Sequence, residues 1–341
     1  MTGDMKVVVA SHSLVAERQF WFWNYVDMQP GVQILKIAPR DWAGHHVDWG
    51  YDIVKPSFAK PWQYASNLDI PDMTTFVFSD QALAVIEDFK PDIIYVQNEA
   101  YCRVTAQLHR IAGRMGCKFA LFAWENLRPY DQMHEEVRHV LSNADLVICG
   151  SRAAENLVKP YNSKTARIIQ VGVDTASFYP QVNAKDYDLI FQGRMVPEKG
   201  IEILKAAAEG KSWKILWPDP QRKDSYSTLY HRYSMAKVHV GHSLDTEFWR
   251  EQHGSYSNYE ALACGLRVAT SHSQEIVESL QGCPGVMFDQ QGYYKEMQRT
   301  IEILLQQEGP NMEGRKWIEQ NYGYAAITEK HIQAFDRVLS K

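Results

Sequence analysis

Short apolar runs rich in β-branched side chains alternate with longer amphipathic segments along the chain. Such runs predict buried parallel strands, and the segments between them predict helices. In the first half, the expected strands are 6–11, 32–38, 92–97, 118–124, 145–149 and 167–172, and the expected helices are 14–27, 80–89, 100–115, 134–142 and 152–158. In the second half, the expected strands are 187–192, 213–217, 238–240, 266–270 and 285–288, with helices at 201–209, 226–235 and 259–264 and a helical tail from 293.

This alternation predicts an α/β protein built from doubly wound parallel sheets. A length of 341 residues favours two domains. The segment 174–186 has no hydrophobic period and contains a proline, so we interpret it as a linker. We therefore expect a Rossmann-like N-terminal domain over 1–173 and a Rossmann-like C-terminal domain over 187–322. The helix expected at 323–341 leaves open a return onto the N-terminal domain. Two such domains predict a cleft that holds the ligand.

Composition narrows the class of protein. A net charge of −5 argues against a non-specific nucleic-acid binder. No apolar run approaches the roughly 20 residues of a membrane span, and the N-terminus does not resemble a secretory signal. The five cysteines form no CxxC pair, which favours reduced thiols in a cytoplasmic protein. The aromatic run 20–23 is interpreted as part of a buried helix or as a platform for a sugar or lipid headgroup. Peripheral contact with a membrane therefore stays open.

Two loops in the second half carry the residues best suited to an anionic ligand. In 193–200 (GRMVPEKG), Arg194 and Lys199 flank an expected helix N-terminus, which together suit a diphosphate. Alternatively, this is a surface turn with two solvated cations. The second loop precedes a helix and carries Glu251 and Gly254, with Glu260 following. A glycine that admits close backbone approach, beside carboxylates that accept from hydroxyls, suits a phosphorylated, hydroxyl-rich ligand.

Polar side chains also follow the predicted strands of the first half. Ligands of doubly wound sheets bind beyond the carboxyl ends of the strands. His12 follows the first strand directly, and Glu99, Glu125 and Asn126 follow later ones. A carboxylate at such a position is as often a helix cap or a solvated loop group.

The motifs GRMVPEKGIEIL and WREQHGSYSNYEALACGLRVATS resemble the donor domain of retaining glycosyltransferases of the GT-B fold, the large family four (glycosyl transferases group 1). The segments KVVVASHS, PDIIYVQNE and VGVDTASFYP resemble further parts of that family, so the resemblance covers nearly the whole chain. It implies two Rossmann-like domains facing across a cleft. It also implies retaining transfer of a sugar from a UDP- or GDP-linked donor to a glycan, a lipid-linked acceptor or a small molecule.

The resemblance also assigns roles to individual residues. Arg194 and Lys199 would contact the donor diphosphate, Glu251 would face the transferred sugar, and Glu260 would bind the ribose hydroxyls. The other expected donor-binding residues are Gly193, Gln252, His253, Gly254 and Ser255. Because protein cations would neutralise the diphosphate, no metal and no cofactor is expected. His12, Glu99, Glu125 and Asn126 are acceptor-side candidates.

The sequence departs from the family pattern at one informative point. The family usually places seven residues between its two glutamates, whereas eight separate Glu251 from Glu260. Either the loop bulges by one residue, or Gln252 takes the sugar-facing place as a neutral amide. Two other functions stay open: a nucleotide-sugar epimerase of the same fold, and a non-catalytic nucleotide-sugar-binding protein with a decayed site.

Overall fold

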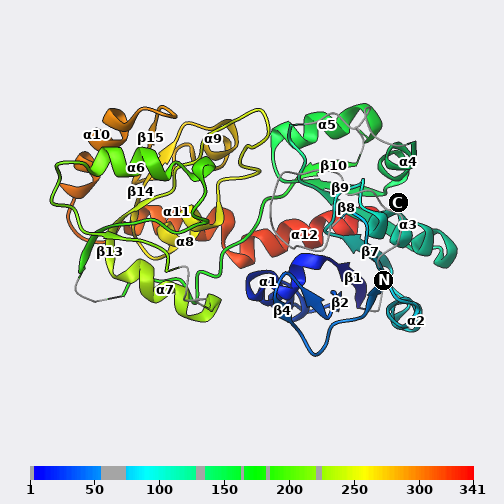
Figure 1. Cartoon of the computed structure of the whole chain (residues 1–341). Coiled ribbons are helices and arrows are strands. Elements are labelled where there is room, and N and C mark those ends of the chain that lie inside the picture. The colour runs from blue at the N-terminus through cyan, green and yellow to red at the C-terminus, as the bar shows by residue number, and fades with distance from the viewer. Residues whose placement is uncertain (1–3, 55–73, 128–134, 163–164, 182–184, 220–224) are drawn as a thin grey trace. The chain divides into compact units, whose positions relative to one another are not determined.

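The computed structural model describes residues 4–54, 74–127, 135–162, 165–181, 185–219 and 225–341. The chain forms two units, one of residues 1–169 with 328–341 and the other of residues 170–327. In each unit, helices flank a parallel β-sheet (Figure 1). Residues 182–184 of the expected linker and residue 134 of an expected helix lie outside the described residues.

The first unit holds a six-stranded sheet in the order β10-β9-β8-β7-β1-β2. All its strand pairs are parallel. Val7, Val8 and Val9 are fully buried, as expected of a strand covered on both faces. The strands are β1 (Met5–Ala10), β2 (Val32–Ile37), β7 (Ile93–Val96), β8 (Lys118–Ala123), β9 (Leu146–Cys149) and β10 (Ala166–Ile168). The helices are η1 (His12–Val15), α1 (Glu17–Asp27), α2 (Asp80–Phe89), α3 (Arg103–Met115), α4 (Glu135–Asn143) and α5 (Arg152–Asn162).

The second unit holds a five-stranded parallel sheet in the order β12-β11-β13-β14-β15. Helices α6 and α10 lie on one face of it, and α7, α8 and α11 lie on the other (Figure 1). The strands are β11 (Tyr187–Ile190), β12 (Ile215–Leu216), β13 (Ala236–Val240), β14 (Arg267–Ser271) and β15 (Val286–Asp289). The helices are η3 (Pro197–Lys199), α6 (Ile201–Ala208), α7 (Tyr226–Ser234), α8 (Tyr256–Ala263), α9 (Gln274–Leu280), α10 (Tyr294–Leu305) and α11 (Met312–Tyr322).

The last helix is α12 (Tyr324–Leu339), and the chain from residue 328 to 341, which includes most of this helix, belongs to the first unit. There Phe335 is fully buried, with its ring centroid 5.6 Å from that of Tyr95 on β7. His331 is also buried and lies against Trp23 of α1 at a centroid distance of 5.4 Å. The end of the chain is therefore part of the core of the first unit.

Most predicted elements are confirmed, and three differences stand out. Helix α8 begins at Tyr256, three residues before its expected start, so Glu260 lies within the helix. Helix α9 was not predicted. The region between β2 and α2 was expected to be a loop, but its described residues contain two antiparallel pairs of two-residue strands, β3 (Asp41–Trp42) with β4 (His45–His46) and β5 (Ile53–Val54) with β6 (Val77–Phe78).

Strand order fixes where ligands are expected. In each sheet, the second strand in sequence pairs with one side of the first strand, and the third strand pairs with its other side. The strand order therefore reverses between β1 and β7 in the first sheet and between β11 and β13 in the second. Doubly wound sheets bind their ligands beyond the carboxyl ends of the strands at such a switch point. The loops after β11 and β13 therefore occupy the favoured position in the second unit.

Candidate functional site

The loop after β11 brings a lysine into the switch point through a tight turn. The 3₁₀ helix η3 ends at Gly200, whose φ of 66° lies in the left-handed region, and α6 begins at the next residue. Glycine tolerates that conformation, and the turn lets a helix start directly behind the loop. Arg194 is exposed on this loop, whereas the Lys199 side chain is only 16% exposed.

The loop between β13 and α8 is fastened at several points to other loops. The Leu244 N–H donates to the Glu198 carbonyl at 2.8 Å, which joins the two loops directly. The Ser243 N–H donates to Ser271 Oγ at 3.0 Å, and the Asp245 N–H donates to Gln291 Oε1 at 2.8 Å. These bonds fix the first residues of the loop that carries Glu251.

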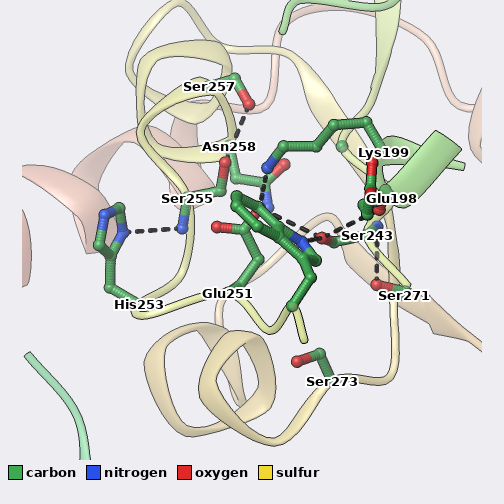
Figure 2. A network of polar contacts seen from close by, with 12 residues as sticks. Glu198, Lys199, Ser243, Glu251, His253, Ser255, Ser257, Asn258, Ser271 and Ser273 are labelled. Atoms are coloured by element: carbon green, nitrogen blue, oxygen red, sulfur yellow. Dashed lines mark hydrogen bonds and ion pairs between the residues drawn. The ribbon is translucent and has the colours of Figure 1, made fainter. Parts of the chain in front are cut away.

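Lys199 and Glu251 meet between these loops. Lys199 Nζ donates to Glu251 Oε1 in an ion pair, and the Glu251 side chain is 10% exposed. Ser243 Oγ donates to the same carboxylate oxygen at 3.2 Å. Figure 2 shows Lys199 and Glu251 reaching toward each other, with Ser243 beside them. The structure thus brings together a cation of the first loop and a carboxylate of the second.

Trp249 is a member of this cluster that the sequence analysis missed. Its ring centroid lies 4.8 Å from Arg194 Cζ and 5.3 Å from Lys199 Nζ. Its indole N–H donates to Ser243 Oγ at 3.4 Å. A tryptophan two residues before the predicted glutamate was the available signal. The ring holds both cations at one place, since an aromatic face attracts positive charge.

Burial changes the acid–base behaviour of Lys199. Burial, with a smaller contribution from Arg194, lowers the pKa of the Lys199 ammonium from 10.5 to about 8. The Glu251 carboxylate opposes this shift because a nearby negative charge favours the protonated form. A dianionic diphosphate would favour the ammonium further, so this lysine is suited to bind anions near neutral pH.

Residues 252–255 contribute mainly backbone structure. Gln252 is partly exposed, and His253 Nδ1 accepts from the Ser255 N–H at 3.0 Å. Ser255 has a φ of 69°, a strained value for a residue with a side chain. The Gly254 N–H donates to Tyr259 Oη at 3.2 Å, and a Cβ at Gly254 would lie 2.6 Å from that oxygen. Close packing therefore already requires glycine at this position.

Glu260 lies in α8 with no exposed surface. The Tyr233 hydroxyl donates to Glu260 Oε2 at 2.9 Å. A ribose could reach this carboxylate only if neighbouring side chains moved. Gly193 lies in the loop after β11, beside Arg194, and is partly exposed.

Of the acceptor-side candidates, His12 and Glu99 follow the two strands of the switch point in the first sheet, β1 and β7, whereas Glu125 and Asn126 follow the neighbouring strand β8. His12 Nδ1 and Asn98 Nδ2 are 2.8 Å apart, which joins the loop after β1 to the loop after β7. Burial lowers the pKa of His12 to about 4, while the bond to Asn98 opposes that shift. The imidazole is therefore neutral at physiological pH.

Glu99 and Glu125 both bind backbone groups. Glu99 Oε1 accepts from the N–H groups of Trp124 and Glu125, at 2.6 and 2.8 Å. Glu125 Oε1 accepts from the Leu127 N–H at 2.9 Å. Asn126 is buried next to them. These carboxylates thus shape the loop after β8, and His12 is the acceptor-side candidate whose ring is held by a side chain of the neighbouring loop.

Two further observations concern metals and membranes. Within the described ranges, no three His, Cys, Asp or Glu side chains gather as a metal-binding group. None of the helices in those ranges is both long enough and apolar enough to cross a bilayer.

Comparison with known proteins gives a match at the level of structure alone. Neither the protein-family models nor the curated proteins match the sequence. A glycosyltransferase from Rickettsia africae aligns with a TM-score of 0.70 and 10% identity, over 99% of both chains. Sucrose-phosphate synthase from Thermosynechococcus elongatus aligns with a TM-score of 0.67 and 16% identity, over 98% of this chain and 99% of the other. The chain has the GT-B fold.

A third GT-B structure was solved with a nucleotide. Anabaena HepE in complex with UDP aligns with a TM-score of 0.68 and 12% identity, over 98% of this chain and all of HepE. At such low identities, the likeness concerns the fold. The expected fold class is therefore confirmed.

Proposed function

We propose that this chain is a retaining glycosyltransferase of the family-four type that moves a sugar, of hexosyl type, from a nucleoside-diphosphate sugar to a hydroxyl acceptor. The observation that carries the proposal is the grouping of Arg194, Lys199, Trp249 and Glu251 at the switch point of the second sheet. Two cations on one aromatic face, beside a carboxylate, suit a diphosphate joined to a polyhydroxylated group. The GT-B fold and the UDP complex of HepE support a UDP-linked donor, with a GDP-linked donor as the other candidate.

The proposed chemistry begins with cleavage of the bond between the anomeric carbon and the diphosphate oxygen. The electron pair of that bond leaves with the diphosphate, and Arg194 and Lys199 stabilise the negative charge that develops there. Because these side chains supply positive charge, the proposal requires no metal and no cofactor. The acceptor oxygen then bonds to the anomeric carbon on the face that the diphosphate left, and its proton passes to the departing phosphate.

Glu251 is the proposed sugar-facing residue, in preference to Gln252. Its carboxylate already lies at the diphosphate-binding cations, and it can accept from two sugar hydroxyls. Donor binding would require Lys199 to share its ammonium between Glu251 and the diphosphate. His12 is proposed to contact the acceptor, which is a glycan, a lipid-linked molecule or a small molecule. All five cysteines are free thiols, which supports a cytoplasmic place of action, including the inner membrane face.

The test uses the full chain and a panel of UDP- and GDP-linked sugars, each with and without candidate acceptors. Release of nucleoside diphosphate that depends on an acceptor supports transfer, and the anomeric configuration of the product, measured by NMR, tests retention. Arg194→Ala should lower turnover strongly, and Arg110→Ala, an exposed arginine paired with Glu136, is the control. Epimerised donor without transfer would favour the epimerase, and tight donor binding without turnover would favour a decayed site.

A further inference from the structure

Behind the candidate donor site lies a buried pair of polar residues that the proposed reaction does not use. His242 follows β13, and Asp289 ends β15, with β14 between those two strands. His242 Nε2 and Asp289 Oδ1 are 2.8 Å apart, and each side chain is 1% exposed. The bond therefore spans the carboxyl edge of the sheet and fixes the orientation of the imidazole ring.

The other edge of the same ring meets the cation loop. A Cβ built on Gly200 would lie 2.6 Å from His242 Nδ1 and 3.3 Å from its Cβ, so the ring packs directly on the Gly200 backbone. Within the described part of the chain, Nδ1 makes no hydrogen bond. The contact is thus steric, and it limits where the Gly200 turn can lie.

Both ends of this contact are next in sequence to residues of the Lys199–Glu251 cluster. Gly200 follows Lys199, and Ser243, whose hydroxyl donates to Glu251 at 3.2 Å, follows His242. The imidazole therefore packs on the backbone directly after Lys199, and it belongs to the loop that carries Glu251. A shift of this ring would move the lysine relative to the carboxylate.

We propose that His242, held in place by Asp289, is a positioning residue that sets the place of Lys199 for a diphosphate. The inference rests on the proposed function, because it concerns the same anion-binding site. A buried polar pair costs desolvation that an apolar pair of similar volume avoids. What the polar pair adds is direction, because its hydrogen bond gives the ring one orientation against Gly200.

The first test measures binding of inorganic pyrophosphate by calorimetry to the full chain. His242→Leu removes the bond to Asp289 and should weaken binding about tenfold or more. His242→Gln keeps a donor near the Nε2 position and should retain most of the affinity. In a Lys199→Met background the His242→Leu change should have little further effect, since interacting residues are not additive.

The second test uses glycines and does not alter the buried pair. Gly200→Ala places a methyl group against His242, and Gly210→Ala is the matched control. Gly210 has a similar φ, 71° against 66°, but its added Cβ would meet nothing within 4 Å. Both variants therefore place a side chain at a similar left-handed φ, and only Gly200→Ala should weaken pyrophosphate binding.

The outcomes separate this inference from the proposed function. Wild-type protein that binds neither pyrophosphate nor a nucleotide sugar would overturn both. Wild-type binding that depends on Lys199, together with an equal loss from His242→Leu in both backgrounds, would overturn the positioning role alone. Equal affinities of the Gly200→Ala and Gly210→Ala variants would do the same. If His242→Leu does not fold, the glycine pair decides.

Discussion

Lys199 and Glu251 are 52 residues apart in sequence and form a direct ion pair at the switch point of the second sheet. Their side chains are 16% and 10% exposed, so water screens the pair only in part. Lys199 is therefore paired with a carboxylate of the protein itself before any ligand binds. A diphosphate that binds here must compete with Glu251, and the carboxylate is then available to sugar hydroxyls.

Glu251→Gln should lower the free energy of unfolding and abolish most of the sugar transfer. The change leaves the Lys199 ammonium without its negative partner, at a cost of about 1–2 kcal/mol in the free energy of unfolding. Pyrophosphate affinity should be unchanged or higher, because the competitor is neutral. Glu202→Gln is the control, since Glu202 pairs with Lys205 on the surface and should contribute about 0.5 kcal/mol or less. Denaturant unfolding measures the free energy of unfolding, and calorimetry measures the pyrophosphate affinity. Weaker pyrophosphate binding by Glu251→Gln would show that Glu251 does not compete with pyrophosphate for Lys199.

Binding of the donor should fall as the pH rises through about 8. The pKa of Lys199 is lowered from 10.5 to about 8, so the ammonium is lost in this range. The pH profile of kcat/KM should show this step, because it reports groups of the free enzyme. Titration of the same group changes the free energy of unfolding in the opposite direction. Between about 8 and 10.5 the unfolded chain binds more protons, so the free energy of unfolding gains from rising pH. Lys199→Met should remove both effects.

Trp249→Leu should weaken pyrophosphate binding about three- to tenfold, because Arg194 and Lys199 lose the aromatic face that holds them. Trp249→Phe keeps a smaller ring and should lie between the wild type and the leucine variant. Titration calorimetry at constant ionic strength measures the series. A leucine variant as tight as the wild type would show that the ring does not organise the cations.

Glu260 can be tested by comparing ligands with and without ribose. If its carboxylate binds ribose hydroxyls, Glu260→Gln should weaken UDP or GDP binding by roughly 1–3 kcal/mol and leave pyrophosphate binding unchanged. Tyr233→Phe removes the hydroxyl that donates to Glu260 and serves as the structural control. Equal nucleotide affinity of the wild type and the Glu260→Gln variant would show that Glu260 does not bind the ribose.

His12 should affect the acceptor half of the reaction alone. His12→Ala should lower acceptor-dependent turnover about tenfold or more while donor affinity stays constant. Its pKa of about 4 keeps the ring neutral, so titration of His12 should leave no step in the profile of kcat/KM between pH 5 and 7. A loss of donor affinity in this variant would contradict the assignment.

Much of the fold follows from local patterns in the sequence. Continuous apolar runs such as 7–9 predict buried parallel strands because both faces of such strands are covered. Helix α9 escaped prediction because two of its four buried residues, Glu275 and Ser279, are polar, which hides the apolar period. The two-residue strands β3 to β6 are too short to show a period at all.

The residues of the site that belong to a sequence motif could be predicted, whereas those that act through packing could not. The loops of Lys199 and Glu251 could be found from their residue types, and their convergence follows from the strand order. The roles of Trp249 and His242 depend on which atoms face their rings, and neither motif nor spacing contains that information. Gly254 illustrates the reverse, since a glycine expected for ligand approach is also required by the Tyr259 hydroxyl.

The return of residues 328–341 to the first unit has a consequence for synthesis on the ribosome. Phe335 and His331, which complete the core around Tyr95, emerge only after the whole of the second unit has been translated. The second unit, by contrast, is one uninterrupted stretch of chain. During translation, the aromatic core of the first unit therefore stays incomplete and partly exposed to solvent until the last helix has been synthesised.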